Sequence, residues 1–292
     1  MSAPKPQRPF DLQKTQKTPA KKYNEISLKV NVSESELNSD IYFICDKKNN
    51  TYYSYDHFNE KNCDIFVDGK KVGFCKSYKF DRIGYHSVLL KLREKIKIIR
   101  DLFFHCKNIV FVDMSRFDCE NLTSMAYSFS RCTNLRHINF NNFNTSKVTT
   151  MCSMFYGCNN LQEIDLSSFN TKNVIDMSQI FYGCEKIKHI NLGNLIMNNV
   201  LNISFLFREC SSLCAVDFKN LNFKNVKTLY GLFYQCSSIS CIIFLGELDK
   251  GAYGDELFVG LGSKGILISN KKNKHKFLKG KNVGKRWKVI KE

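Results

Sequence analysis

Hydrophobic positions of the chain recur with a period of 26 residues. In each of six consecutive copies, a phenylalanine is followed three residues later by a cysteine. The pairs are Phe103 and Cys106, Phe129 and Cys132, Phe155 and Cys158, Phe181 and Cys184, Phe207 and Cys210, and Phe233 and Cys236. A fixed period of this size without insertions is typical of a solenoid, in which stacked units share one continuous core.

Each unit combines two hydrophobic patterns. Leu161, Ile164 and Leu166 have the L-x-x-L-x-L spacing of a leucine-rich-repeat strand, whose alternation directs the residues between them outward. Apolar residues then recur at three- and four-residue spacing, which is typical of one face of a short helix. In this unit they are Val174, Met177, Ile180, Phe181 and Cys184. We therefore expect an α/β solenoid, a leucine-rich-repeat array of six 26-residue strand–loop–helix units over residues 101–245.

Residues 23–100 show a different pattern, with short alternating runs separated by turn signals. Strands are predicted at Ile26–Val32, Asp40–Cys45, Asp64–Val67, Gly73–Phe80, Tyr85–Leu92 and Ile96–Ile99. This spacing indicates a small antiparallel β-sandwich, and the segment YKFDRIGYHSVLLKL is similar to the closing hairpin of immunoglobulin-like domains. Because the first unit of a solenoid exposes an apolar end, we expect this domain to act as a cap.

The two ends of the chain are expected to differ from its body. Residues 1–22, rich in proline and lysine, predict a disordered basic tail. Residues 246–292 are expected to form a C-terminal cap and basic segment, in which Ile266–Ser269 has the pattern of one more strand. The single tryptophan, Trp287, is placed to cover the last exposed core of the array.

The formal net charge of +17 does not follow the repeats. Residues 1–22 carry +5 and residues 271–292 carry +9, whereas residues 101–245 carry only +2. The solenoid body is therefore not a uniform basic track for nucleic acid, and any polyanion site is expected near the C-terminus. The candidate anion-binding residues there are Lys271, Lys272, Lys274, Lys276, Lys279 and Lys281.

The unit MFYGCNNLQEIDLSSFNTKNVIDM closely resembles the BspA-type leucine-rich repeat over about residues 101–245. The resemblance implies a parallel solenoid that binds other macromolecules, often on a cell surface. Two features depart from the family pattern: Leu195, Met197 and Ile203 replace its Phe, Thr and Met, and the N-terminus shows no export signal. Together with 13 cysteines, expected as thiols in a reducing compartment, this favours a cytoplasmic protein, with the extracellular surface as the family-based alternative.

The cysteine column allows three interpretations. Disulfides between neighbouring repeats are geometrically possible, and a metal site would require clustered ligands that the linear column lacks. Small buried thiols beside the phenylalanines are the favoured interpretation, so no metal is expected. The predicted structural core is Phe129, Cys132, Phe155, Cys158, Phe181, Cys184, Phe207, Cys210, Phe233, Cys236 and Trp287.

Outward strand positions supply the candidate binding site. Asp and Asn alternate along one column, which predicts a structural ladder of amide-to-carboxylate hydrogen bonds, with ligand binding as the alternative. The neighbouring columns vary between copies, as a specific binding surface requires. The candidate protein-binding face comprises Arg136, His137, Asn139, Glu163, Asp165, Lys188, His189, Asn191, Asp217 and Lys219. A further array, Phe104, Tyr156, Tyr182 and Tyr234, is predicted on the helix side and is expected to pack.

No catalytic motif stands out, because the chain has no phosphate-cradling glycine loop, no HExxH and no nucleophile elbow. We therefore predict a non-enzymatic scaffold, without a cofactor, that binds a protein partner through its sheet face. The alternatives are a polyanion binder that uses the basic termini on RNA, acidic lipid or acidic protein, and a BspA-like surface adhesin.

Overall fold

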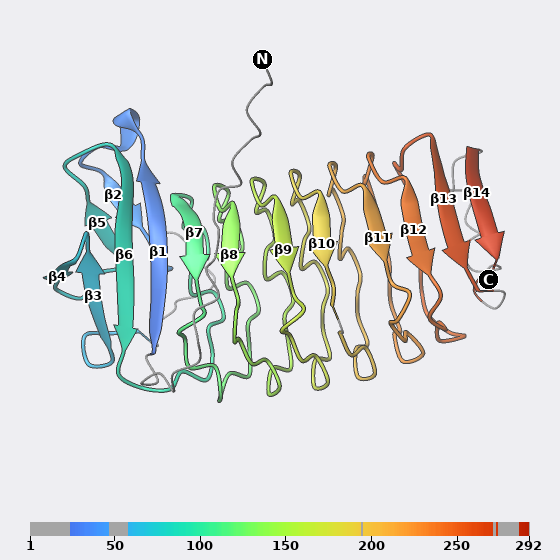
Figure 1. The fold of residues 1–292 in the computed structure, drawn as a ribbon, viewed down its shortest axis with the longest axis horizontal. Coiled ribbons are helices and arrows are strands. Elements are labelled where there is room, and N and C mark those ends of the chain that lie inside the picture. The colour runs from blue at the N-terminus through green and yellow to red at the C-terminus, as the bar shows by residue number, and fades with distance from the viewer. Residues whose placement is uncertain (1–23, 47–57, 194, 271–272, 274–285, 292) are drawn as a thin grey trace, which may run out of the picture.

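β-Strands account for nearly all regular structure in this computed structural model, which describes residues 24–46, 58–193, 195–270, 273 and 286–291 (Figure 1). The first strands are β1 (Glu25–Val32), β2 (Asp40–Tyr42), β3 (Cys63–Val67), β4 (Lys70–Val72), β5 (Ser77–Lys79) and β6 (Gly84–Leu92). The others are β7 (Ile109–Asp113), β8 (His137–Asn139), β9 (Glu163–Asp165), β10 (His189–Asn191), β11 (Ala215–Asp217), β12 (Cys241–Phe244), β13 (Lys264–Ser269) and β14 (Arg286–Lys291). Within the described ranges, one 3₁₀ turn, η1 (Glu34–Glu36), is the only helical segment.

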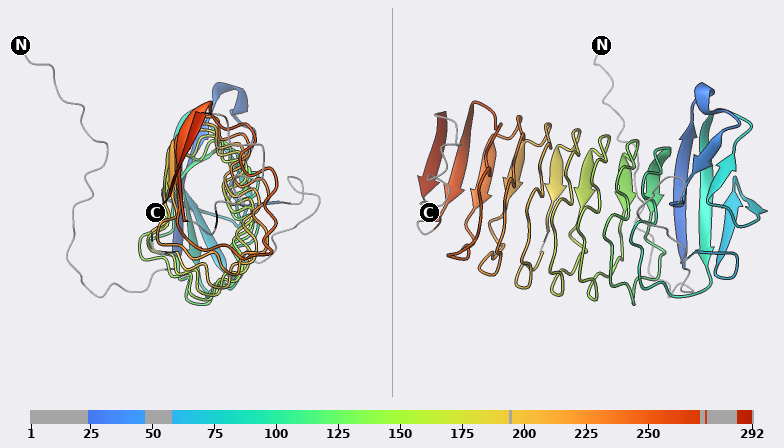
Figure 2. Two further views of the ribbon diagram at one scale, coloured as in Figure 1. Left: turned by 90° about the vertical axis from the view of Figure 1, so that its right-hand side faces the viewer. Right: turned by 180° about the vertical axis from the view of Figure 1, so that it is seen from behind.

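The repeats form a β-solenoid in which each 26-residue unit makes one turn, or rung. Its front wall is a row of short parallel strands, with β7 beside β8, β9 beside β10, and β11 to β14 in sequence. Residues one period apart are paired, as in His137 with Phe111 and His189 with Glu163. Figure 2 shows the strands on one wall and a back wall of turns.

The predicted helices are wrong, and the back wall is built from turns whose backbone bonds connect neighbouring rungs. The Met151 N–H donates to the Asp176 carbonyl, 3.0 Å away, and the Phe155 N–H to the Ile180 carbonyl, 2.9 Å away. Ser153 lies between them in the left-handed region at φ 53°, which a continuous α-helix excludes. Parallel bridges run up this wall through Ser124, Thr150, Asp176, Asn202 and Thr228.

Turns and helices bury the same positions here, which explains the error. The Met154 N–H donates to the carbonyl of Met151, and the Cys158 N–H to that of Phe155, so successive three-residue turns follow one another. Such turns return a side chain to the interior every three or four residues. The apolar spacing therefore predicts burial correctly but cannot distinguish a helix from a string of turns.

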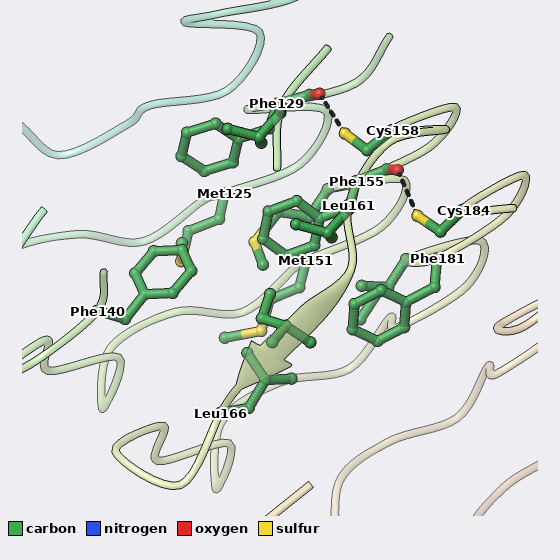
Figure 3. Packing of buried hydrophobic residues seen from close by; sticks show 14 of the residues in the cluster. Met125, Phe129, Phe140, Met151, Phe155, Cys158, Leu161, Leu166, Phe181 and Cys184 are labelled. Carbon is green, nitrogen blue, oxygen red and sulfur yellow. Dashed lines mark hydrogen bonds between the residues drawn. The ribbon is translucent and has the colours of Figure 1, made fainter. Parts of the chain in front are cut away.

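Phenylalanine and cysteine columns form the centre of the solenoid (Figure 3). Neighbouring rings stack with centroid separations of 5.4 Å between Phe129 and Phe155 and 5.8 Å between Phe155 and Phe181. From Cys132 onward, each thiol of the column donates to the phenylalanine carbonyl of the preceding rung, as Cys158 Sγ does to Phe129 at 3.1 Å. The repeat spacing of Phe and Cys is therefore fixed by one stacking contact and one hydrogen bond per rung.

A further turn follows the six predicted ones. Phe258 stacks on Phe233 at 6.1 Å between centroids, although only 25 residues separate them. Near the start of this turn, the backbone approaches the preceding rung so closely that a Cβ at Gly246 would lie 1.9 Å from the Leu221 carbonyl oxygen. Leu261 stands 25 residues after Cys236, so the column continues without its thiol.

The N-terminal strands continue the solenoid sheet instead of forming a separate sandwich. The six-stranded sheet has the order β4-β3-β6-β1-β7-β8, in which β1 pairs antiparallel with both β6 and β7. A second sheet contains only β2 and β5. The strand predicted at Ile96–Ile99 is wrong, since only Ile98 makes an isolated bridge, and the one predicted at Gly73–Phe80 shortens to β5.

β13 and β14 close the other end of the sheet, as the pattern of Ile266–Ser269 and Trp287 predicted. The indole of Trp287 is 8% exposed and donates to the Gly262 carbonyl over 3.0 Å. It packs against Gly265, where a Cβ would lie 2.6 Å from the ring. No helix in the described ranges is long and apolar enough to span a bilayer.

Candidate functional site

The predicted binding residues lie on the outer side of the front wall. All ten are exposed except Asn139, which is half-buried. They stand on or beside β8 to β11, whose central residues Ile138, Ile164, Ile190 and Val216 point inward. The six lysines proposed as an anion site, Lys271, Lys272, Lys274, Lys276, Lys279 and Lys281, fall outside the described residues, as does the basic segment 1–22.

The Asp and Asn side chains of the outward column form hydrogen bonds that hold the backbone turns and link neighbouring rungs. Each side-chain oxygen accepts the N–H two residues later and so ends its strand in a turn, as Asp165 does for Ser167 at 2.8 Å. The amide of Asn191 donates to Asp165 over 2.9 Å, and that of Asn139 donates to Asp113 over 3.0 Å. These contacts support the structural interpretation of the column, since Asp113 and Asp165 each already have a donor from their own turn and one from the next rung.

One variable row remains open to a partner. Strand register aligns Lys29 with Phe111 and His137 on one sheet, and Glu163 with His189 on the next. Their side chains are solvent-facing, and the imidazole Nδ1 of His137 lies 4.0 Å from the Glu163 carboxylate, which brings the two sets together in one row. The six-stranded sheet joins the N-terminal cap to the first rungs of the solenoid, so a ligand on its part of the row can contact both.

A shallow depression of about 470 Å³ lies at that junction. Phe66, Leu89 and Phe111 form its apolar floor, and Lys29 and Lys91 stand over the aromatic rings. The ammonium of Lys91 is 5.1 Å from the Phe66 ring centroid, and that of Lys29 is 6.0 Å from the Phe111 centroid. Both distances suit cation–π contacts, which hold the lysine stems across the floor.

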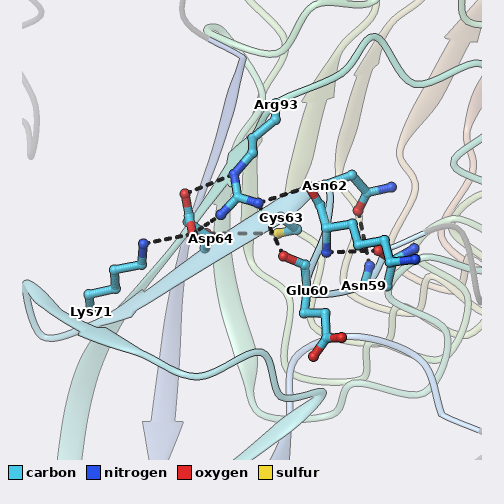
Figure 4. A network of polar contacts seen from close by, with 8 residues as sticks. Asn59, Glu60, Asn62, Cys63, Asp64, Lys71 and Arg93 are labelled. Atoms are coloured by element: carbon cyan, nitrogen blue, oxygen red, sulfur yellow. Dashed lines mark hydrogen bonds and ion pairs between the residues drawn. The ribbon is translucent and has the colours of Figure 1, made fainter.

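Ion pairs make the surroundings of the depression basic. At the Lys91 end, Asp64 pairs with Lys71 and Arg93 (Figure 4), and Glu25 pairs with Lys91 and Arg116, so four basic side chains meet two carboxylates. At the other end, Lys29 lies near Asp68, which pairs with Arg82 at 2.9 Å. The described residues that line the depression itself include no carboxylate.

The depression was not predicted from the sequence, because residues 23–100 were expected to act as a cap. A signal was available in the alternation of the strands. Phe66 and Leu89 occupy outward positions, opposite each other in the register of β3 and β6, where polar residues are expected. Two apolar outward residues that face each other indicate a patch on the surface.

A second depression of about 420 Å³ brings Asp68, His86 and Ser87 together without the geometry of a nucleophile site. The imidazole Nδ1 contacts Asp68 at 2.7 Å, but its Nε2 faces the Arg82 carbonyl and not the serine hydroxyl. Ser87 instead donates to Asp68. Burial raises the Asp68 pKa, but hydrogen bonds from His86, Ser87 and Arg82 outweigh it and lower the pKa to about 2. The group is a structural polar cluster.

The thiols show no ligand geometry. None of the 13 cysteines, all of which lie in the described ranges, forms a disulfide, and those of the Phe-Cys column are buried. Burial raises the pKa of the Cys236 thiol to about 12 and that of Cys210 well above its usual range, which keeps both protonated. Among the described residues, no group of three or more His, Cys, Asp or Glu side chains is placed to hold a metal ion.

The aromatic array predicted on the helix side lies on the back wall of turns. Tyr156 and Tyr182 stack at 4.6 Å, and the Arg208 guanidinium lies 4.2 Å over the Tyr234 ring. Arg208 also pairs with Glu209 at 3.1 Å. These half-exposed side chains satisfy one another across neighbouring rungs, in agreement with a packing role.

In comparisons with known proteins, the chain matches one family model. No curated protein and no solved structure matches the chain. The family described as "Mycoplasma protein of unknown function, DUF285" matches residues 97–213 and 123–243. The two matches together span every rung from the first turn to the strand β12, half of the chain. The chain therefore belongs to this family of mycoplasma proteins built from solenoid repeats.

Proposed function

We propose that the protein is a non-enzymatic scaffold that binds a protein partner on the outer face of its front sheet. The observation that carries the proposal is the outward row from Lys29 to His189, with an apolar depression beside it at the cap junction. Exposed apolar floors with polar rims are typical of interaction sites. The resemblance of the repeat to the BspA-type leucine-rich repeat supports the same function.

Backbone bonding on both walls suits this task. The front strands pair in parallel, and turn residues such as Met151 and Phe155 donate to the next rung on the back wall. A surface held in this way is preformed, so little conformational entropy is lost when a partner binds. A preformed sheet face of this kind favours a broad, flat protein interface over a closed ligand pocket.

For the compartment, we propose the cytoplasm. Buried thiols without disulfides are stable in a reducing environment, which supports this proposal. The family resemblance supplies the alternative, a surface adhesin that would use the same sheet face. The second functional alternative is polyanion binding through residues 271–292, which carry a net charge of +9.

The test is affinity capture from the native source with the full-length protein and two matched variants. The first combines His137→Ala, Glu163→Ala and His189→Ala on the front face. The control combines Lys147→Ala, Lys172→Ala and Lys224→Ala, which are also exposed but lie in the turns that follow the strands. A partner retained by the wild type and the control but lost by the first variant supports the proposal. Equal retention by all three contradicts it.

A chain lacking residues 271–292 is unsuitable for testing the alternative, because it also loses β14 and Trp287. Replacing Lys271, Lys272, Lys274 and Lys276 with Gln leaves that strand intact. Loss of the partner in this variant alone, with a steep dependence on salt, would favour the polyanion function.

A further inference from the structure

The depression at the cap junction has enough geometric detail to define a ligand. On β1 and β6, Lys29 pairs with Ser87, and Lys91 pairs with Glu25. The two lysines are therefore four positions apart along the strand direction, or roughly 13 Å at 3.3 Å per residue. Midway between them, Leu89 faces Ser27 and forms the centre of the apolar floor beside Phe66.

An extended peptide reproduces this spacing with its own side chains. Alternate residues of an extended chain point to one side, so positions i and i+4 lie roughly 13 Å apart and position i+2 lies between them. Carboxylates at i and i+4 would meet Lys29 and Lys91, and an apolar side chain at i+2 would cover Leu89 and the Phe66 and Phe111 rings.

Charge complementarity supports an acidic ligand. No carboxylate is among the described residues that line the depression. At its Lys91 end, four basic side chains share two carboxylates, and at its other end Lys29 stands beside the Arg82–Asp68 pair. The serine hydroxyls of Ser27 and Ser87 add polar contacts within the floor. A basic peptide would meet like charges at both ends, and a purely apolar one would leave both ammonium groups without a partner from the ligand.

We propose that the depression binds an extended peptide segment of its protein partner, with the pattern acidic–any–apolar–any–acidic, laid along the strands β1 and β6. This inference rests on the proposed function and gives the partner a recognisable sequence feature. The contacts are made to a half-open surface, which predicts modest affinity and strong dependence on salt.

The test uses labelled peptides and fluorescence anisotropy on the full-length protein. The probe contains the core Glu-Thr-Phe-Thr-Glu, and its scrambled control Glu-Glu-Phe-Thr-Thr has the same composition but places the two carboxylates on opposite sides of an extended chain. We expect the scrambled core to bind at least tenfold more weakly. A core with Ser in place of Phe tests the apolar floor, and we expect a similar loss.

Protein variants locate the site. Lys29→Gln and Lys91→Gln are each expected to weaken probe binding severalfold, and the double variant to abolish it. Lys224→Gln, at an exposed lysine in the turn that follows β11 and outside the candidate binding face, is the matched control and should leave the affinity unchanged. Circular-dichroism melts of all variants, expected to coincide with the wild type, show that the fold is intact.

Three results would overturn the inference: equal binding of the scrambled core, no effect of the double lysine variant, or displacement of the probe by a single-stranded oligonucleotide at lower concentration than by unlabelled probe. The last would assign the depression to phosphates. If the probe fails while the front-face variant still loses its captured partner, this inference fails and the proposed function stands. If the probe does not bind and the front-face variant also keeps its captured partner, both this inference and the proposed function are contradicted.

Discussion

Asp101 is a buried carboxylate in a conformation that few side chains adopt. It is 3% exposed at φ 59°, and its Oδ1 has no hydrogen-bond partner within the described residues. Burial raises its pKa to about 6, although Arg100 acts in the opposite direction. The folded protein therefore binds a proton that the unfolded chain releases near pH 4. Above pH 6 the charged form destabilises the fold, and this cost is relieved as the pH falls towards 4.

Asp101→Asn removes the charge and keeps a residue type that tolerates the left-handed region. We expect it to raise the free energy of unfolding at pH 7 by up to about 3 kcal/mol and to flatten the stability profile between pH 4 and 6. Urea unfolding over that pH range measures both effects. Asp81→Asn, at an exposed carboxylate, is the control, and identical profiles for the two variants would contradict the assignment.

Thiol reactivity should follow burial. Cys214 is exposed, whereas the Phe-Cys column is buried with raised thiol pKa values. We expect a thiol reagent to modify Cys214 rapidly, the half-buried Cys75, Cys152 and Cys241 more slowly, and the column only after unfolding. Denaturation without reductant should then release all 13 thiols, and a smaller count in anaerobically purified protein would indicate disulfides or bound metal.

At the scale of one rung, the phenylalanine column should dominate stability. Phe155 is fully buried between the rings of Phe129 and Phe181. We expect Phe155→Ala to lower the free energy of unfolding by about 3–5 kcal/mol, through lost burial and an unfilled cavity. Because neighbouring rungs are coupled, the whole array should melt earlier or over a wider range.

The adjacent position supplies the control. Tyr156 is half-exposed and stacks on Tyr182 on the back wall. Tyr156→Ala should therefore lower the free energy of unfolding clearly less than Phe155→Ala does. Thermal and urea melts of the two variants decide the comparison. Equal losses would mean that the back-wall stack stabilises the rung as much as the interior does.

The strands, the turns and the surface depression could be predicted from the sequence to different extents. The Leu161, Ile164 and Leu166 pattern placed a strand correctly, because a period of two has few other structural explanations. The spacing of Val174 and Met177 identified buried positions but not the turns that bury them, since their backbone partners lie in another rung. The outward Phe66 and Leu89 were overlooked because a surface patch forms only when β3 and β6 pair.

On the scale of the whole molecule, cap and solenoid should unfold together. Val30 is fully buried in β1, the strand that pairs with both β6 and β7. Val30→Asp would place an unpaired carboxylate in the core, which should lower the free energy of unfolding by about 3–5 kcal/mol. Hydrogen exchange should then accelerate in β7 and β8 as well as in the cap.

The comparison variant is Lys29→Asp on the adjacent outward position, which introduces the same side chain into solvent. It should leave exchange in the solenoid unchanged. Faster exchange confined to β1 and β6 in Val30→Asp would instead show that the cap opens as an independent unit.

The antiparallel pairing of β1 with β7 also bears on filament growth. Successive rungs, such as those of β7 and β8, place parallel strands side by side and are related by a repeated translation. This repeat ends at β1, which runs antiparallel to β7. Beyond the cap, the sheet ends in β4, three residues that begin with Lys70 and Lys71. A short, charged edge of this kind resists strand addition. Head-to-tail polymers need two compatible ends, so we expect that copies of this chain do not extend into a fibre through their sheets.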